Sequence, residues 1–229
     1  MKLSIIIPCF NEEKTIQTLI DKVYNLKIDK QIIFIDDKSQ DGSCKILKNN
    51  EDKIDKIIFH KKNLGKGGAI ISAKKYIEGD FVVIQDADLE YDPSDLIRMF
   101  NEIVKKKYEV LYGSRVLKKK RYNNKDFTSN FRIFANHILT IFSNIINKQN
   151  LTDAHTCYKM FSKSLFNKVE LKENDFSFCP EITTKVSNLN IKIHEISISY
   201  QGRTYNEGKK ITFTDGFKAL YTLLKYSKK

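Results

Sequence analysis

Three acidic residues, spaced one residue apart, follow a short apolar segment. Asp86, Asp88 and Glu90 come directly after residues 81–84, whose sequence is FVVI. Carboxylate oxygens are the ligands that Mg²⁺ and Mn²⁺ prefer, and two acids at this spacing can share one divalent cation that in turn binds phosphate. The alternative is a polar loop before a helix that begins near residues 92–95, but that interpretation leaves the three earlier acids unexplained.

The first half of the chain alternates strand patterns with helix patterns. The expected strands cover residues 3–7, 31–35, 56–59, 81–84 and 108–112. Such alternation predicts a mostly parallel sheet with right-handed crossovers. Pro8 is expected to close the first strand, since proline cannot donate to a central ladder. An acidic or glycine-rich cluster follows each strand, so these clusters should meet along one sheet edge, where open α/β sheets bind nucleotides.

The second half begins with a basic loop at residues 118–125. Further segments have the pattern of a helix at 131–146, a strand at 157–161, a helix around 181–186, a strand at 191–200 and an amphipathic basic helix at 213–229. The wide apolar face of residues 131–146 is interpreted as core, with contact to a membrane surface as the alternative. No internal repeat interrupts this order.

Composition indicates an ordinary globular protein with a preference for anionic partners. The chain has 229 residues, 41% of them hydrophobic, and a formal net charge of +12. This charge favours nucleotide, nucleic acid or a membrane surface without choosing among them. The four cysteines are far apart, which predicts neither a zinc site nor disulfides and favours a reducing, cytoplasmic location. No apolar run reaches the roughly 18 residues needed to span a bilayer, so a peripheral association is the most that is expected.

The glycines of residues 63–68 precede an expected helix, and the loop has the sequence NLGKGG. Glycines before a helix suit either phosphate binding or close backbone packing. The loop fits neither GxxxxGK[ST] nor GxGxxG, so a P-loop or a Rossmann dinucleotide site is not supported.

Seven motifs together resemble a known family. They are IIIPCFNEE, IDDKSQDGS, NLGKGGAI, VVIQDADLEYDP, YGSR, TDAHTCYKMF and YQGRTYNEGKKI. Their order and spacing are similar to those of family-2 inverting glycosyltransferases, in the polyprenyl-phosphate branch that includes dolichyl-phosphate mannosyltransferase. The resemblance implies the GT-A fold: a Rossmann-like, mostly parallel α/β sheet flanked by helices, with C-terminal helical and strand additions. It also implies a single domain, in which residues 1–115 bind the nucleotide sugar and residues 116–229 bind the acceptor.

The resemblance assigns donor-site roles. Asp86, Asp88 and Glu90 are expected to hold Mg²⁺ or Mn²⁺. Arg203 and Lys209 match a late basic loop that folds over the donor diphosphate, where they would stabilise the leaving group. The nucleoside pocket and the adjoining donor site are expected to include Pro8, Phe10, Glu12, Ile35, Asp37 and Ala87.

The resemblance also assigns the acceptor site. Arg115 and Arg132 match arginines that receive the acceptor phosphate, with Asp153 expected to contact the sugar or to pack beside it. The expected reaction moves a sugar from GDP-mannose or a UDP-hexose to a dolichyl or undecaprenyl phosphate. The expected location is the cytoplasmic face of a membrane, reached through the basic surface, the 131–146 helix, the C-terminal tail or a separate anchoring protein.

Three alternatives stay open from the sequence. A sugar hydroxyl acceptor would need a base, for which Glu181 is the candidate, although an ordinary acid near a helix start is the simpler interpretation. A nucleic-acid or membrane-binding module would use the +12 charge, but no RNA or DNA motif is present, so nucleic acid is not expected as a partner. A nucleotidyltransferase would also use metal-binding acids, but the glycine-rich signature expected near its N-terminus is missing.

Overall fold

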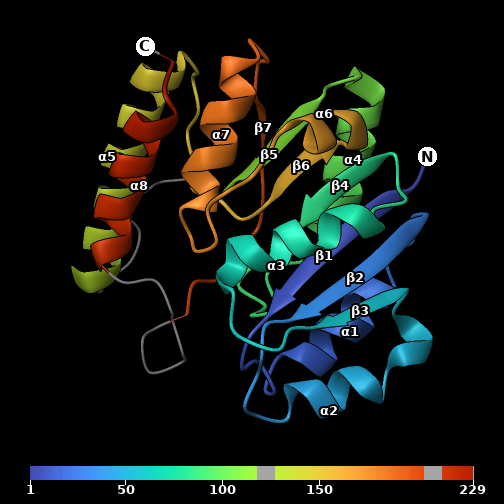
Figure 1. The fold of residues 1–229 in the computed structure, drawn as a ribbon. Helices are drawn as coiled ribbons and strands as arrows, with labels where there is room; N and C mark the ends of the chain where they lie inside the picture. The colour runs from blue at the N-terminus through green and yellow to red at the C-terminus, as the bar shows by residue number, and fades with distance from the viewer. Residues whose placement is uncertain (118–126, 204–212, 229) are drawn as a thin grey trace.

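The structure is a computed structural model, and it describes residues 1–117, 127–203 and 213–228. The side chains of residues 127–132 and 213 are also outside the description. Within the described residues, seven strands form one sheet in the order β3-β2-β1-β4-β6-β5-β7 (Figure 1). Their bounds are β1 (Leu3–Cys9), β2 (Lys30–Asp36), β3 (Lys56–Phe59), β4 (Phe81–Ile84), β5 (Val110–Ser114), β6 (Lys159–Ser162) and β7 (His194–Ser197).

The sheet is mostly parallel, as the sequence predicted. Strand β6 runs antiparallel to both of its neighbours, β4 and β5, and all other pairings are parallel. Strands β6 and β7 come from the second half of the chain and lie in the same sheet as β1 to β5. Both halves of the described chain therefore contribute strands to a single sheet, and the C-terminal strands β6 and β7 are part of it.

Pro8 does not end the first strand, contrary to expectation. Strand β1 continues through Pro8 to Cys9, and Pro8 lies opposite Ile35 of β2. On its other side, β1 pairs with β4 only as far as Ile6. Pro8 is therefore beyond the β4 ladder, where the missing N–H of proline removes no hydrogen bond from that ladder.

The helices include one, α6, that the sequence pattern did not predict. They are α1 (Ile16–Tyr24), α2 (Ser43–Lys48), α3 (Gly65–Ala73), α4 (Asp95–Lys106), α5 (Phe127–Asn147), α6 (Lys163–Lys168), α7 (Phe178–Asn188) and α8 (Phe213–Tyr226), with short 3₁₀ turns at Glu51–Lys53 and Lys74–Tyr76. Helices α2 and α6 have six residues each, too few for an apolar repeat to show. None of the helices in the described ranges is both long and apolar enough to cross a membrane.

Helices α5, α7 and α8 pack together beside one end of the sheet (Figure 1). The expectation that the apolar face of the 131–146 helix lies in the core is wrong. Large apolar side chains of α5 are exposed, Ile145 to 70% and Phe134 to 49%. The reason is that α5 packs on the body through polar residues, among them Thr140 and Ser143, which are buried.

The glycine loop serves close backbone packing, the second of the two roles that the sequence left open. A Cβ atom at Gly67 would lie 2.1 Å from the backbone oxygen of Glu173, and one at Gly65 would lie 2.5 Å from that of Asn174. The backbone N–H of Gly68 donates to the same Asn174 oxygen at 3.0 Å. The N-terminus of α3 is thereby fixed against the segment that leads into α7.

Gly67→Ala should therefore destabilise the fold. The added methyl group overlaps backbone that cannot move as a flexible side chain would, and we expect a loss of about 1–3 kcal/mol in the free energy of unfolding, measured by urea denaturation. Gly216→Ala in α8 is the matched control, because a Cβ atom there meets nothing within 4 Å. Equal stability of the Gly67→Ala protein and the wild type would contradict this packing.

Candidate functional site

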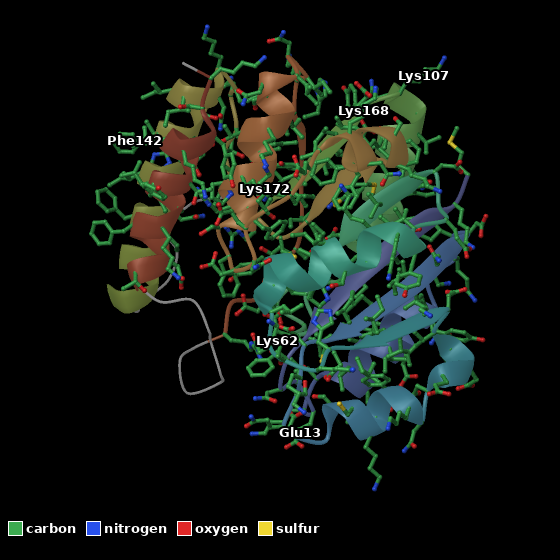
Figure 2. The ribbon with its side chains drawn as sticks, viewed as in Figure 1. Glu13, Lys62, Lys107, Phe142, Lys168 and Lys172 are labelled. Carbon is green, nitrogen blue, oxygen red and sulfur yellow. The ribbon has the colours of Figure 1, made fainter. Side chains whose placement is uncertain are left out.

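The carboxyl ends of β1, β2, β4 and β5 reach the same edge of the sheet, because these strands are parallel. The segments after these strand ends contain several of the residues singled out from the sequence: Glu12, Asp37, Asp86, Asp88, Glu90 and Arg115. Figure 2 labels Glu13, after β1, and Lys62, after β3, at this edge. Strand direction therefore gathers residues that are far apart in the chain.

Arg203 lies among the carboxylates of this edge. Its Nη1 and Nη2 donate to the two carboxylate oxygens of Glu12 at 3.0 and 3.1 Å, and Nη2 also donates to Asp88 at 3.2 Å. The backbone N–H of Arg203 donates to Glu90 at 2.8 Å. One guanidinium therefore neutralises acids from two strand ends, in the paired geometry that suits arginine.

Glu90 ties the segment after β7 to the site. Its carboxylate accepts the hydroxyl of Tyr200 at 2.6 Å, and its backbone oxygen accepts the N–H of Gln201 at 2.8 Å. The ring of Tyr200 in turn lies 5.1 Å from the guanidinium carbon of Arg115. Tyr200 thus connects the carboxylates after β4 to the arginine after β5.

Asp88 carries negative charge that its surroundings only partly neutralise. Burial, followed by the charges of Asp86 and Glu90, raises the pKa of Asp88 to about 7, and Arg203 opposes the shift. Asp86 itself forms an ion pair with Lys66 of α3. A buried carboxylate with a raised pKa beside other acids is a site where an additional cation would relieve repulsion.

The chemistry of these residues fits a divalent cation. Asp86, Asp88 and Glu90 supply hard oxygen donors on one turn after β4, and the charges of Asp86 and Glu90 add to the effect of burial in raising the pKa of Asp88. In the described part of the chain, no group of three or more His, Cys, Asp or Glu side chains is arranged as a metal cage. Arg203 and Lys66 instead contact the carboxylates that the sequence assigned to the metal.

Asp37 caps the N-terminus of α3. Its carboxylate accepts the backbone N–H groups of Leu64 and Gly65 at 2.8 and 2.7 Å. It also lies 2.7 Å from Nδ1 of His60, whose Nε2 is 2.9 Å from the Ser72 hydroxyl. The sequence placed Asp37 in the nucleoside pocket and the adjoining donor site; the structure pairs it with His60 and buries it.

Arg115 and Asp153 form a buried ion pair after β5. Arg115 donates through Nε and Nη2 to the two carboxylate oxygens of Asp153 at 2.7 and 2.8 Å, and its backbone N–H donates at 3.1 Å. Burial opposes ionisation of Asp153, but the charge and hydrogen bonds of Arg115 prevail and lower its pKa to about 2. Glu195 accepts the backbone N–H groups of Thr152 and Asp153, which holds the pair in place.

Glu181, the candidate base of the alternative mechanism, is fully buried in α7. Its carboxylate accepts the backbone N–H groups of Lys172 and Glu173 at 2.8 and 2.9 Å and pairs with Lys185 at 2.7 Å. These bonds support the segment that packs on the glycines of α3. The contacts favour the simpler interpretation of Glu181 as a structural acid.

The other predicted residues are divided between the edge and the core. Pro8 and Phe10 are half-buried at the end of β1. The side chain of Ile35 is fully buried in the core, and Ala87 is buried with its backbone oxygen bonded to the Thr15 hydroxyl. The side chain of Arg132 and all of Lys209 lie outside the described residues.

Two site residues were given no role at the sequence level. Lys66 was part of the NLGKGG motif, and its ammonium group contacts Asp86 and lies 3.5 Å from the Cys157 sulfur. Tyr200 was part of the YQGR motif, and its hydroxyl binds Glu90. The motifs that contain Lys66 and Tyr200 were identified from the sequence, but the strand pattern could not predict that these two side chains contact Asp86 and Glu90.

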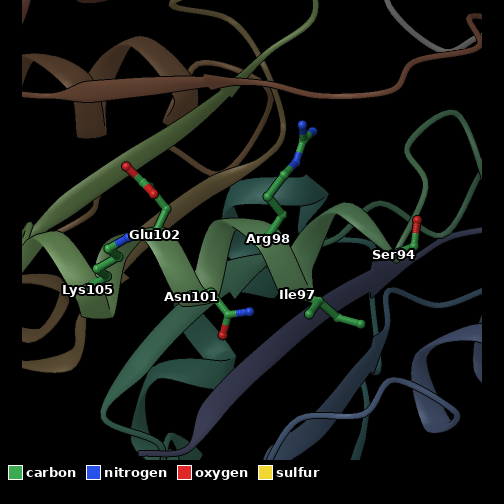
Figure 3. A pocket seen from close by; sticks show the side chains of 6 residues that line it. All are labelled: Ser94, Ile97, Arg98, Asn101, Glu102 and Lys105. Atoms are coloured by element: carbon green, nitrogen blue, oxygen red, sulfur yellow. The ribbon is translucent and has the colours of Figure 1, made fainter.

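A surface hollow on α4 is separate from these residues. Six side chains line it: Ser94, Ile97, Arg98, Asn101, Glu102 and Lys105 (Figure 3). All come from α4 or the residue before it, and Arg98 is paired with Asp95 at 2.7 Å. None of the predicted site residues lines this hollow.

Comparison with known proteins identifies a family and close relatives. Residues 4–170 match the family model described as Glycosyl transferase family 2. The chain is 29% identical to a UDP-N-acetylglucosamine–dolichyl-phosphate N-acetylglucosaminyltransferase of Methanococcus voltae, over 96% of this chain and 94% of that one. It is 25% identical to an undecaprenyl-phosphate 4-deoxy-4-formamido-L-arabinose transferase of Proteus mirabilis, over 97% of this chain and 67% of that one.

A solved structure shares the fold. Glucosyl-3-phosphoglycerate synthase from Mycobacterium tuberculosis, in complex with Mg²⁺ and uridine diphosphate, superposes with a TM-score of 0.73 at 14% identity. The match covers 99% of this chain and 79% of that one. The expected GT-A fold is therefore confirmed.

Asp153→Asn should destabilise the protein in a pH-dependent way. Because the folded-state pKa of Asp153 lies near 2, below its ordinary value of 3.8, the ion pair stabilises the fold above pH 4 and is lost as the pH falls toward 2. We expect the variant to lose about 3 kcal/mol of unfolding free energy at pH 7, and the difference from wild type to shrink below pH 4.

Urea denaturation at several pH values measures this difference. Asp52→Asn is the control, because Asp52 is an exposed acid in the Glu51–Lys53 turn, and such changes alter stability by less than about 0.5 kcal/mol. A difference between Asp153→Asn and wild type that stays constant from pH 7 to pH 2 would rule out the charge of Asp153 as its source.

Proposed function

The chain belongs to glycosyl transferase family 2, and from this premise we propose that it transfers a sugar from a nucleotide diphosphosugar to a polyprenyl phosphate, with inversion at the anomeric carbon. The observation that carries the proposal is the link through Tyr200 between two groups at one sheet edge. Acids suited to a metal and diphosphate lie on one side of it, and an arginine suited to a phosphate lies on the other.

For the donor, we propose a UDP-sugar held with Mg²⁺ or Mn²⁺. Asp88, with Glu90 and Asp86, would hold the cation, which supplies positive charge to the departing diphosphate. Support comes from the hard oxygen donors of these residues and from the raised pKa of Asp88. The M. voltae relative uses UDP-N-acetylglucosamine and the M. tuberculosis structure contains uridine diphosphate, which favours uridine over guanosine as the base of the donor.

Arg203 is proposed to exchange its partners when donor binds. In the structure it neutralises Glu12 and Asp88, the charges that a metal would otherwise balance. An arginine released from these carboxylates suits the donor diphosphate, because its planar fork makes paired hydrogen bonds to phosphate oxygens. Lys209 would join it there, and Pro8, Phe10, Glu12 and Asp37 are proposed to surround the nucleoside.

For the acceptor, we propose that Arg115 and Arg132 position the phosphate of a polyprenyl phosphate. Arg115 is held by Asp153 through Nε and Nη2, and its Nη1 donates to no described residue. A phosphate is already anionic at neutral pH, so the attack needs no general base, only positioning for in-line approach. The burial and bonding of Glu181 agree with a mechanism that lacks a carboxylate base.

A polyprenyl phosphate resides in a membrane, so we propose that the protein acts peripherally at the cytoplasmic face. The names of the M. voltae and P. mirabilis relatives include lipid phosphates of this class. The net charge of +12 supports attraction to anionic lipid. A separate anchoring protein is a second route to the same location.

Asp88→Asn should abolish metal-dependent donor binding. A ligand that binds only the folded state at 100 times its dissociation constant stabilises it by about 2.7 kcal/mol. We expect UDP-sugars with Mn²⁺ to raise the melting temperature of the wild type and of Asp52→Asn, but not of Asp88→Asn. Equal stabilisation of all three proteins by donor with Mn²⁺ would remove Asp88 from the donor site.

Arg132→Ala should impair transfer to the lipid phosphate. Loss of a charged hydrogen bond to phosphate costs about 1.5–3 kcal/mol, so kcat/KM for the acceptor should fall about 10- to 100-fold. Transfer of radiolabelled sugar to a short isoprenyl phosphate measures this change in kcat/KM.

Glu181→Gln removes the charge of a structural acid. This variant should have a lower melting temperature than the wild type but the same transfer rate per folded molecule. Loss of transfer in Glu181→Gln, together with unchanged transfer in Arg132→Ala, would favour a hydroxyl acceptor with Glu181 as base.

A further inference from the structure

Helix α5 turns its polar side toward the protein and its apolar side outward. The described side chains that it buries are polar: Thr140, Ser143 and Asn147 are at most 7% exposed. On its opposite side, Phe142 is 44% exposed and Ile145 is 70% exposed. Figure 2 shows Phe142 pointing away from the body of the protein. A helix of a water-soluble domain normally turns its apolar side toward the core, so the exposed apolar side of α5 is suited to contact with an apolar partner or a membrane.

The polar side of α5 has specific partners, so the orientation of the helix is fixed. Asn144 donates to the backbone oxygen of Leu151 and accepts its N–H, both at 2.8 Å. Thr140 accepts the N–H of Ala154 at 3.3 Å, and Asn136 donates to Asp153 at 3.3 Å. Rotation of α5 to bury its apolar side would break all of these bonds.

Helix α8 packs beside α5 (Figure 1) and also has exposed apolar side chains. Its exposed Tyr221 and Leu224 are three residues apart and so lie on one side of the helix. We call the combined surface the α5/α8 face. It is defined by Phe134, Ile141, Phe142, Ile145, Tyr221 and Leu224.

The charges around the α5/α8 face match an anionic surface. Helix α5 contains no acidic residue, and Asp215 is the single acid of α8. Lys148 and Lys228, just beyond the C-terminal ends of the two helices, are exposed. Lys218 and Lys225 of α8 are also exposed, but they pair with Asp175 and Glu173. Apolar side chains bordered by lysines, with almost no acid, are typical of surfaces that lie in a membrane interface.

We infer that the α5/α8 face docks onto the surface of an anionic lipid bilayer, with its aromatic and aliphatic side chains entering the headgroup region. The inference rests on the proposed function in one respect: a polyprenyl phosphate acceptor lies in a membrane, so an enzyme that uses it must reach the membrane surface. Helix α5 contacts Asp153 on its polar side, and Asp153 holds Arg115. Docking through the opposite side of α5 therefore orients the proposed phosphate-binding arginine relative to the bilayer.

Vesicle flotation tests the docking. The full chain is mixed with vesicles of phosphatidylcholine and phosphatidylglycerol, or of phosphatidylcholine alone. We expect the wild type to float with the mixed vesicles. Phe142→Asp and Ile145→Asp should each lower the partition coefficient of the protein between vesicles and water about tenfold, because a charge replaces an apolar side chain that would enter the bilayer. Phe59→Asp on β3 is the matched control, since Phe59 is 41% exposed on the opposite edge of the sheet, and it should float as the wild type does.

Three outcomes overturn the inference. The first is equal flotation of Phe142→Asp, Ile145→Asp and Phe59→Asp, and the second is no flotation of the wild type. The third is a wild-type dimer in light scattering that Phe142→Asp dissociates, which would assign the face to a second copy of the chain. Melting curves verify that each variant is folded.

Transfer to a short, water-soluble isoprenyl phosphate separates this inference from the proposed function. If the face only docks, Phe142→Asp keeps the wild-type rate with this acceptor. If no variant and no wild-type protein transfers sugar to it while the flotation pattern holds, the docking surface stands and the proposed acceptor is wrong.

Discussion

Repulsion between carboxylates at one sheet edge is the constraint on which the site depends. Parallel strands bring Glu12, Asp86, Asp88 and Glu90 to the same edge, and their partial burial weakens the screening by water. Burial of Asp88, followed by the charges of Asp86 and Glu90, raises its pKa. The fold tolerates these acids because cationic side chains lie between them, and the same charge density makes the edge suitable for a metal and a diphosphate.

The cations at this edge come from distant parts of the chain. Lys66 reaches Asp86 from α3, and Arg203 reaches Asp88 and Glu12 from the segment after β7. The two cations differ in what holds them. Lys66 belongs to a helix whose glycines are packed against backbone, whereas Arg203 follows a strand of four residues. Arg203 is thus the cation better placed to change partners when a ligand brings its own charge.

Helix α5 connects the site to the outer surface. Its polar side binds the segment that contains Asp153, and so it supports the ion pair with Arg115. Its apolar side has no cover among the described elements and forms most of the α5/α8 face. One helix therefore satisfies buried polar groups on one side and presents an apolar surface on the other.

Local patterns in the sequence determined the elements and the composition of the edge. Apolar β-branched runs gave strands β1 to β5, and the acids after them gave the site, because strand direction alone brings such residues together. The ends of elements were less certain: β1 passes through Pro8 because β4 has already stopped pairing there, and α2 and α6 are too short for a repeat.

Only the tertiary structure decided which charges meet and which side of a helix faces inward. The pairing of Arg203 with Glu12 joins residues 191 positions apart, and no spacing rule covers that separation. The apolar pattern of α5 was identified correctly, but its direction was not, because periodicity shows that a helix has two sides without showing what lies against each. The hydrogen bonds that Thr140 and Asn144 share with the segment at residues 151–154 fixed that direction, and they exist only once the chain has folded.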